Sequence, residues 1–420
     1  MTILRFPTRS QAGSGLRVLH YTTWREKCGI AGYAESLIDA LSARGLSNEV
    51  FPLRRGEFKY FSSAEVRNHL IAFLDFARDY DLIHIQHEFS FFGNTPDFYE
   101  MNANFFWLLD KLAAAKKPVA VTFHTEPFYV PTVIPLRQRI RRALTLKGPP
   151  FNWHGKRYFG RGVSGRIAFV HAQKSRLCLI RTGFGEANVR VIPMGVGSRS
   201  SQMLHLSPAV AKARLGFPQD STLLSLFGFV AGYKGHEIAV RALRSLPRNF
   251  ALAVVGGSHP EGGDETIDTM LNLWKKRDPE RFRITGYVSR EDLDLYHAAT
   301  DICLAPYTDP NLASSAAITW ALSSGKPVVA SSIPTFREIQ ERTDCLALVT
   351  RKCPEELAWQ IRRLAADPAW QRELVVNAQR FCKESSWAKV AERVGAAYEE
   401  LLGTSVVGKP NSVAIKHRAA

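Results

Sequence analysis

Ionisable side chains stand at the ends of two short apolar runs in the first half of the chain. The run 81–87 leads into Glu88, and the run 118–123 leads into His124. Burying an unpaired charge is costly, so packing alone does not explain such groups at the ends of core strands. One histidine in this position is more often structural than catalytic, but two clusters at one sheet edge predict a site. Glu88 and His124 are therefore the candidate catalytic residues.

Glycine and lysine mark candidate phosphate-binding loops. Gly29 and Gly32 follow an apolar run at 17–21 and open a helical pattern, where backbone N–H groups can approach an anion. A tight turn that packs a helix on a sheet explains the same glycines equally well. Lys234 precedes Gly235 at another helix start, where an ammonium group and the helix dipole both attract a phosphate.

Two serines stand before a helical pattern at 316–323. Ser314 and Ser315 fit an N-cap, with spare hydroxyl groups and free backbone amides for a second phosphate contact. A plain N-cap without a ligand is the alternative, and the sequence leaves both open.

Short runs rich in Val, Ile and Phe alternate with longer amphipathic stretches along the chain. Continuous apolar runs favour parallel strands buried on both faces. Strands that alternate with helices indicate doubly wound sheets. The expected strands are 17–21, 81–87, 118–123, 166–171, 189–193, 222–229, 250–256, 282–286, 302–307, 327–331 and 345–349. The expected helices include 33–43, 64–76, 236–246, 290–299, 316–323 and 355–366.

The length of 420 residues suits two such domains. A polar segment at 195–208 is the expected linker between an N-terminal Rossmann-like domain, 16–195, and a C-terminal one, 209–385. Ligands of open α/β sheets bind at the carboxyl ends of the strands, so we expect a cleft there. A last helix at 386–402 is placed to cross back to the first domain, and the basic stretch 403–420 is expected to be disordered.

Composition narrows the class of protein. The 45% hydrophobic and 22% charged content is that of a water-soluble globular protein, and no apolar run approaches the ~18 residues that span a bilayer. Residues 1–15 lack the apolar run of a signal peptide. The six cysteines form no CxxC pair, so neither a zinc site nor a disulfide framework is predicted. A cytoplasmic location is the expectation.

The net charge of +16 is unevenly distributed. Twelve basic residues and no acidic ones lie between Glu126 and Glu186. Such a block indicates a polyanionic neighbour, or else a solvated basic face. Around an apolar stripe at 136–144 the pattern is that of an interfacial helix, which predicts peripheral contact with the inner face of an anionic membrane. The predicted membrane or acceptor contacts are Arg137, Arg139, Arg141 and Arg142.

The order and spacing of these motifs from Leu16 to Leu402 resemble the retaining GT-B glycosyltransferase family, which includes glycogen synthases and bacterial mannosyltransferases. The segments that carry the resemblance are the loop 28–32, 84–88, 122–125, 191–196, Gly228 with 234–235, 285–287, and 321–331 with Glu338.

The resemblance implies a GT-B fold, two Rossmann-like domains that face each other across a cleft. The C-terminal domain would hold a nucleotide-diphosphate-sugar donor, and the N-terminal domain would hold a glycan or lipid-linked acceptor. It further implies no metal, no cofactor and no nucleic acid partner. His124 would lie beside the transferring sugar, Lys234 would hold the diphosphate, and the base would lie at 287–288. The implied donor-binding set is Gly29, Gly32, Lys234, Tyr287, Val288, Ser314, Ser315 and Glu338.

Four positions depart from the family pattern. Leu312 and Trp320 replace two glutamates eight positions apart, Phe229 replaces an arginine, and Met194 replaces a histidine. Three hypotheses follow. The first is a retaining glycosyltransferase of polysaccharide or glycolipid synthesis. The second is a GT-B phosphorylase or nucleotide-sugar epimerase, and the third is a non-catalytic GT-B binding subunit.

Overall fold

The N-terminal half of the chain forms a parallel six-stranded sheet. In the computed structural model, which describes residues 16–93, 98–125, 151–197, 206–258 and 264–403, its strand order is β2-β1-β3-β4-β5-β6. Every neighbouring pair runs parallel. The strands are β1 (Arg17–Thr23), β2 (Ser47–Leu53), β3 (Leu82–His87), β4 (Val119–Phe123), β5 (Arg166–Val170) and β6 (Val189–Val191).

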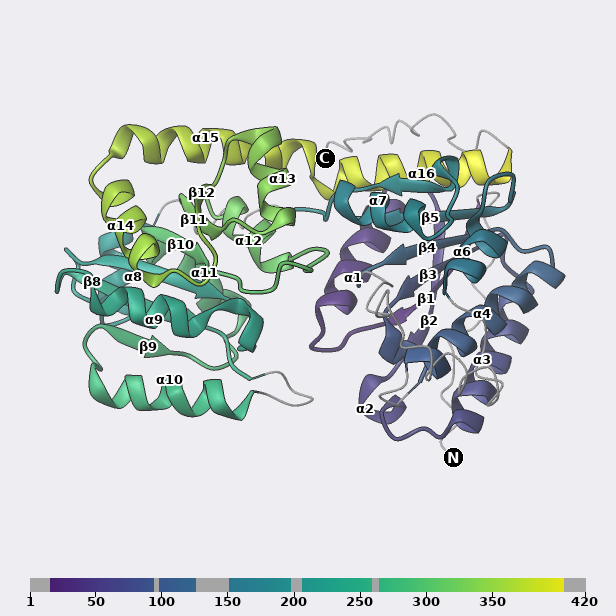
Figure 1. The fold of residues 1–420 in the computed structure, drawn as a ribbon, viewed down its shortest axis with the longest axis horizontal. Helices are drawn as coiled ribbons and strands as arrows, with labels where there is room; N and C mark the ends of the chain where they lie inside the picture. The colour runs from purple at the N-terminus through teal and green to yellow at the C-terminus, as the bar shows by residue number, and fades with distance from the viewer. Residues whose placement is uncertain (1–15, 94–97, 126–150, 198–205, 259–263, 404–420) are drawn as a thin grey trace, which may run out of the picture.

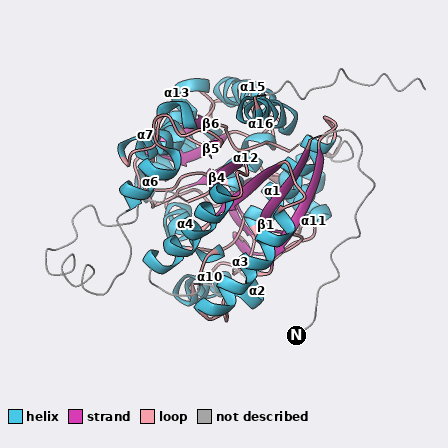
Figure 2. Ribbon diagram, turned by 90° about the vertical axis from the view of Figure 1, so that its right-hand side faces the viewer, coloured by secondary structure: helices cyan, strands magenta, loops and turns pink. Residues whose placement is uncertain are grey.

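Helices cover both faces of this sheet (Figures 1 and 2). Local sequence explains some of their ends: α3 begins at a capping box in which Ser62 and Glu65 satisfy each other's backbone N–H groups. The helices are α1 (Gly29–Ser42), α2 (Arg55–Phe58), α3 (Ser63–Ala77), α4 (Phe98–Ala114), α6 (Phe151–Phe159) and α7 (Gln173–Arg181), with 3-10 turns η1 (Phe89–Phe91) and η2 (Glu186–Asn188).

The C-terminal half repeats the architecture with the order β12-β11-β10-β7-β8-β9. Its strands are β7 (Thr222–Phe227), β8 (Phe250–Val255), β9 (Phe282–Ile284), β10 (Ile302–Ala305), β11 (Val328–Ser331) and β12 (Ala347–Val349). Its helical elements are α8 (Pro208–Arg214), η4 (Gly232–Lys234), α9 (His236–Arg244), α10 (Glu265–Arg277), α11 (Arg290–Ala299), α12 (Ala316–Ser323), α13 (Pro334–Thr343), α14 (Pro354–Ala365) and α15 (Pro368–Glu384). The two doubly wound parallel sheets expected from the sequence are confirmed.

The last helix leaves the C-terminal half and packs on the N-terminal one. α16 (Trp387–Leu402) lies along the N-terminal domain in Figure 1, whereas α15 lies along the other domain. Buried residues of α16, among them Val390, Val394 and Tyr398, share a core cluster with Tyr33 and Leu37 of α1. The N-terminal core is therefore completed by the end of the chain.

Strand β2 was not expected. It is an edge strand, and most of its side chains are exposed or half-buried, so it lacks the continuous apolar run that reveals the central strands. The expected linker begins with structure of its own, because Val196 pairs with Ser386 in an isolated parallel bridge.

Candidate functional site

Loops from the carboxyl ends of both sheets meet between the domains. Lys27, in the loop after β1, places its Nζ 4.3 Å from the ring centroid of Tyr287, in the loop after β9. Lys174, in the first turn of α7 after β5, donates from Nζ to the carbonyl of Pro310 at 3.0 Å. The carboxyl ends of parallel strands are where open α/β sheets bind ligands, so these contacts locate the candidate site.

Lys234 places a buried ammonium group in this region. Its side chain is 6% exposed, and burial lowers its pKa from 10.5 to about 8. Within the described ranges no hydrogen-bond acceptor and no carboxylate pairs with its ammonium group. A buried cation is costly unless paired, so the site suits an anion that arrives as a ligand.

The position of Lys234 requires glycine at two nearby positions, because a side chain at either one would clash. Gly228 has φ +100°, and a Cβ there would lie 2.5 Å from the Lys234 Nζ. Gly235 has φ +72°, and its Cβ would lie 1.9 Å from the Pro306 carbonyl oxygen. Gly228 follows β7 and Pro306 follows β10, the two strands on either side of the point where the strand order reverses. This is the ligand-binding position of a doubly wound sheet.

The N-terminus of helix α9 lies directly after Lys234 and Gly235. α9 begins at His236, its N-cap Gly235 offers no side chain, and the first-turn N–H groups are therefore not satisfied by a cap. The His236 imidazole is buried with both ring nitrogens unpartnered. Burial, with a smaller effect of the Lys234 charge, lowers its pKa to about 3, so the ring is neutral.

Ser314 and Ser315 lie at the start of α12. Ser315 is the N-cap: its Oγ accepts from the N–H of Ile318 at 3.3 Å and shares a hydrogen bond with the Tyr307 hydroxyl at 3.0 Å. Ser314 is half-buried beside it. The capping role explains Ser315, and the predicted phosphate contact of both serines stays a prediction.

Gly29 and Gly32 lie in the first turn of α1. Figure 1 shows this helix on the side of the N-terminal domain that faces the other domain. Neither has a positive φ, and a Cβ at either position would meet nothing within 4 Å. Neither backbone conformation nor packing within the described protein requires these glycines. The space beside them is open to a ligand, and the N-cap Cys28 makes no side-chain cap.

Tyr287 and Val288 lie in the loop that follows β9, and their contact with a base stays a prediction. The Tyr287 ring is 64% exposed, and Val288 packs against the core. Lys27, which the sequence analysis missed, reaches this ring from the N-terminal domain.

The N-terminal edge of the site holds Glu88 and His124. Glu88 follows β3 and accepts a hydrogen bond from the Thr125 hydroxyl, and burial raises the pKa of its carboxyl group above the ordinary value. His124 follows β4, and its Nε2 lies 2.8 Å from Oε1 of Gln86. The two predicted clusters thus lie at one sheet edge, joined by the Glu88–Thr125 bond.

Glu338, in α13, contacts the N-terminal domain. Its carboxylate accepts hydrogen bonds from the N–H of Gln173 at 2.8 and 2.9 Å and from that of Lys174 at 3.4 Å. It therefore binds the N-terminus of α7 across the domain boundary, a favourable place for a negative charge. Its contact with a donor stays a prediction.

Three further residues near His124 escaped the sequence analysis. His171 stands at the end of β5 as His124 does at the end of β4, so the same strand-end rule could have found it. The ring of Tyr33, in α1, packs against His124 with centroids 4.8 Å apart, and Trp387, in α16, packs on Tyr33 with centroids 5.2 Å apart. No local signal marks Trp387, because it comes from the far end of the chain.

Several predictions concern residues outside the described ranges or absences within them. Arg137, Arg139, Arg141 and Arg142 lie outside the described residues. Among described residues, no group of three His, Cys, Asp or Glu side chains is placed to hold a metal ion. None of the helices in those ranges has the length and apolarity to cross a membrane.

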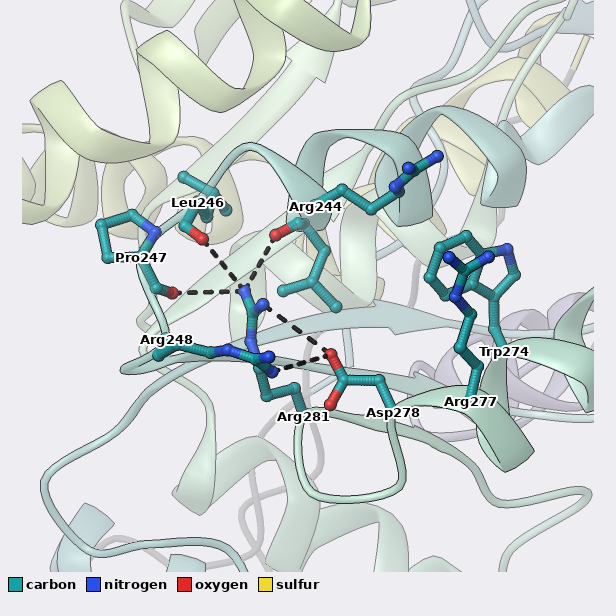
Figure 3. Close-up of a pocket in the computed structure, with 9 residues that line it drawn as sticks. Arg244, Leu246, Pro247, Arg248, Trp274, Arg277, Asp278 and Arg281 are labelled. Atoms are coloured by element: carbon teal, nitrogen blue, oxygen red, sulfur yellow. Dashed lines mark hydrogen bonds and ion pairs between the residues drawn. The ribbon is translucent and has the colours of Figure 1, made fainter.

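A hollow of about 440 Å³ lies elsewhere, at the amino ends of β8 and β9 (Figure 3). Arg281 crosses it and donates to the carbonyls of Phe250 at 2.9 Å and Leu243 at 2.8 Å. Asp278 pairs with Arg281 and Arg248. Because Arg281 ties the end of α9 to β8, the hollow has a structural explanation and lies at the opposite sheet edge from Lys234.

Comparison with known proteins agrees with this geometry. Residues 222–367 match the family model described as Glycosyl transferases group 1. Sucrose-phosphate synthase from Thermosynechococcus elongatus superposes with a TM-score of 0.68 at 20% identity, over 93% of this chain and all of that one. HepE of Anabaena, solved with UDP-glucose, gives 0.65 at 18% identity, over 92% of this chain and all of that one. The fold is GT-B.

Curated relatives point to the same enzyme class. A D-inositol 3-phosphate glycosyltransferase of Nocardiopsis dassonvillei is 24% identical over 73% of this chain and 71% of its own length. A 2-deoxystreptamine glucosyltransferase of Streptomyces kanamyceticus is 25% identical over 53% of this chain and 57% of its own length. This is an enzyme of the glycosyltransferase type. The match spans only about half the length of several of these relatives.

Proposed function

We propose that this glycosyltransferase takes its sugar from a nucleotide-diphosphate donor, and that Lys234 binds the diphosphate. The buried, unpaired ammonium group of Lys234 carries this proposal. The uncapped start of α9 adds the positive end of a helix dipole beside it. The likeness to HepE, which was solved with UDP and with UDP-glucose, supports a donor of this chemical class.

In the proposed reaction an acceptor hydroxyl attacks the anomeric carbon of the donor sugar. The glycosidic bond to the acceptor forms, the bond to the diphosphate oxygen breaks, and the hydroxyl proton leaves with the nucleotide diphosphate. Lys234 and the start of α9 stabilise the charge that develops on the leaving diphosphate. Contacts between the domains, such as Lys174 with Pro310, exclude water from the closed site and so limit donor hydrolysis.

Retention of the anomeric configuration is the stereochemistry that we propose, on the basis of the sequence resemblance. The acceptor would lie on the N-terminal domain near Glu88 and His124, and would be a glycan or a lipid-linked sugar of polysaccharide or glycolipid synthesis. Proton NMR of the first product formed distinguishes retention from inversion through the anomeric coupling.

Binding of nucleotide diphosphates tests the donor proposal. Lys234→Met should weaken binding of UDP, or of the nucleoside diphosphate that binds best, by about ten- to a hundredfold, because a hydrogen bond to a charged group contributes about 1.5–3 kcal/mol. Titration calorimetry measures the change, with Lys275→Met on the exposed face of α10 as the control. Unchanged affinity in a folded Lys234→Met protein would refute the assignment.

We also propose that the basic segment between Glu126 and Glu186 docks the enzyme on an anionic membrane, where a lipid-linked acceptor would lie. Each basic residue near such a surface contributes about 1 kcal/mol, so the four arginines could hold the protein reversibly. Replacing Arg137, Arg139, Arg141 and Arg142 with Ser should abolish sedimentation with phosphatidylserine vesicles. The wild-type protein should bind less at high salt. Equal binding to neutral and anionic vesicles, or to neither, would contradict this proposal.

A further inference from the structure

Five polar side chains form a continuous hydrogen-bonded series from the candidate site into the N-terminal core. His171 Nε2 lies 3.4 Å from His124 Nδ1, and His124 Nε2 lies 2.8 Å from the Gln86 side-chain amide. The other end of that amide lies 3.3 Å from His84 Nε2, and the Tyr398 hydroxyl lies 2.6 Å from His84 Nδ1. The series joins β5, β4, β3 and α16.

The inner part of this series is cut off from solvent. Gln86, His84 and Tyr398 are fully buried, whereas His124 and His171 are half-buried at the domain boundary. Burial lowers the pKa of all three imidazoles, to about 4 for His171 and well below 6.5 for the other two. Each ring is therefore neutral at pH 7 and carries one N–H and one lone pair.

The carbonyl of Ile192 sets the direction of the hydrogen bonds. It lies 3.0 Å from His171 Nδ1, and a carbonyl only accepts, so His171 carries its proton on Nδ1. The lone pair of His171 Nε2 then accepts from His124, whose proton must be on Nδ1. The lone pair of His124 Nε2 in turn requires a donor from Gln86.

Only the amide orientation opposite to the one with Oε1 toward His124 supplies that donor, and a half-turn that exchanges the oxygen and nitrogen of Gln86 gives it without changing the shape of the side chain. With its NH₂ toward His124, its oxygen faces His84 and accepts from the Nε2–H of that ring. The same N–H points at the Thr122 hydroxyl oxygen, 2.8 Å from Nε2, which accepts from it as well. His84 then offers the lone pair of Nδ1, which accepts from the Tyr398 hydroxyl. All five groups are satisfied without an added proton, and all the bonds point from Tyr398 toward Ile192. The opposite amide orientation leaves two acceptors facing each other unless the series takes up a proton.

We propose that Tyr398 and His171 are positioning residues that fix the tautomer and orientation of His124 through this series. The inference rests on the proposed function only in treating His124 as a residue of the reaction site. Both ring nitrogens of His124 are bonded within the N-terminal domain, so neither is free to act as a general base. The ring presents its edge and its backbone to the sugar, held between Tyr33 and the series.

Histidine tautomers can be read directly by NMR. The full-length chain, labelled with ¹⁵N-histidine, should show Nδ1–H tautomers for His124 and His171 and an Nε2–H tautomer for His84 at pH 7. Assignment uses substitution of each histidine by asparagine. His87 serves as an internal control, because it is buried with both nitrogens unpartnered and lies outside the series.

Tyr398→Phe removes the first donor and keeps the ring in the core. In the NMR spectrum it should shift the ¹⁵N signals of His84 and His124 and leave those of His87 unchanged. In the enzyme assay it should lower kcat by about tenfold, the equivalent of one lost hydrogen bond, and leave KM for the donor unchanged. Tyr80→Phe is the matched control: it loses the hydrogen bond to Glu49, in the same domain, and should alter neither the His124 signals nor kcat.

The outcomes separate the two proposals. An Nε2–H or protonated His124 in the wild type, or His124 signals unmoved by Tyr398→Phe, would overturn the positioning role. A fixed Nδ1–H tautomer in a protein that binds no nucleotide diphosphate would uphold the hydrogen-bonded series while refuting the proposed function. Loss of stability in Tyr398→Phe without a tautomer change would reduce Tyr398 to a packing role and overturn the proposal.

Discussion

Lys234 holds a positive charge where water cannot fully solvate it. Its pKa in the folded protein is about 8, against 10.5 for the free side chain, and burial is the cause. Below pH 8 the folded and unfolded chains both carry this proton, and the folded protein bears the full cost of the buried charge. As pH rises from 8 to 10.5 only the folded chain has lost the proton, so this cost is relieved.

Donor binding should have the opposite pH dependence, because a diphosphate needs the charged ammonium group. The dissociation constant of a nucleoside diphosphate should rise by up to about tenfold for each pH unit above 8. Calorimetric titrations at pH 7, 8 and 9 measure it. The weak binding that remains in Lys234→Met should lose this dependence, and an equally steep dependence in that variant would assign the titration to another group.

Helix α9 links the candidate site to the hollow of Figure 3. Its first residue, His236, follows Lys234 and Gly235, and Arg281 binds the carbonyls of Leu243 in its last turn and of Leu246 just beyond it. Arg281 also bonds β8 through Phe250, so it fixes the helix to the sheet at the end far from Lys234. A displaced α9 would carry Lys234 with it.

Arg281→Met should lower the free energy of unfolding by about 1.5–3 kcal/mol, because it removes several charge-assisted hydrogen bonds and leaves carbonyls unpaired. Urea denaturation measures the loss. Arg248→Met is the control from the same hollow: its side chain is 82% exposed and its bond to Asp278 is a surface pair, so a change within about 0.5 kcal/mol is expected. Equal losses in both variants would contradict this role of Arg281.

The elements that sequence could predict are those with a self-contained signal. Strands β7 and β8 are continuous apolar runs, and Ser315 caps α12 in the manner that its position suggests. β2 escaped because an edge strand buries too little to show a period. The same limit applies to the site: strand-end polarity located His124 and Glu88. His171 follows a strand in the same way, whereas the connection of His124 through Gln86 and His84 to Tyr398 depends on contacts that only the folded chain creates.

The relative position of the two domains depends on a few polar contacts, of which the Glu338 carboxylate at the start of α7 is the most connected. Glu338→Ala should lose about 1.5–3 kcal/mol of closing energy. This shifts the balance toward an open form by about ten- to a hundredfold. Small-angle X-ray scattering of the unliganded protein should then show a larger radius of gyration. Glu341→Ala, at an exposed position of the same helix, is the control. An unchanged radius of gyration in Glu338→Ala would show that the Glu338 contact does not stabilise the closed form.

The return of α16 to the N-terminal domain also has a consequence for the order of synthesis. The residues that begin the sheet leave the ribosome first, yet Tyr33 and Leu37 cannot be covered until Val390 to Tyr398 have been made. At about 5–20 residues per second, the roughly 350 residues between Leu37 and Val390 impose a wait on the order of 20–70 seconds. Throughout this interval the nascent chain exposes an apolar helix face, so the domain that is translated first completes its core only after the second domain has been made.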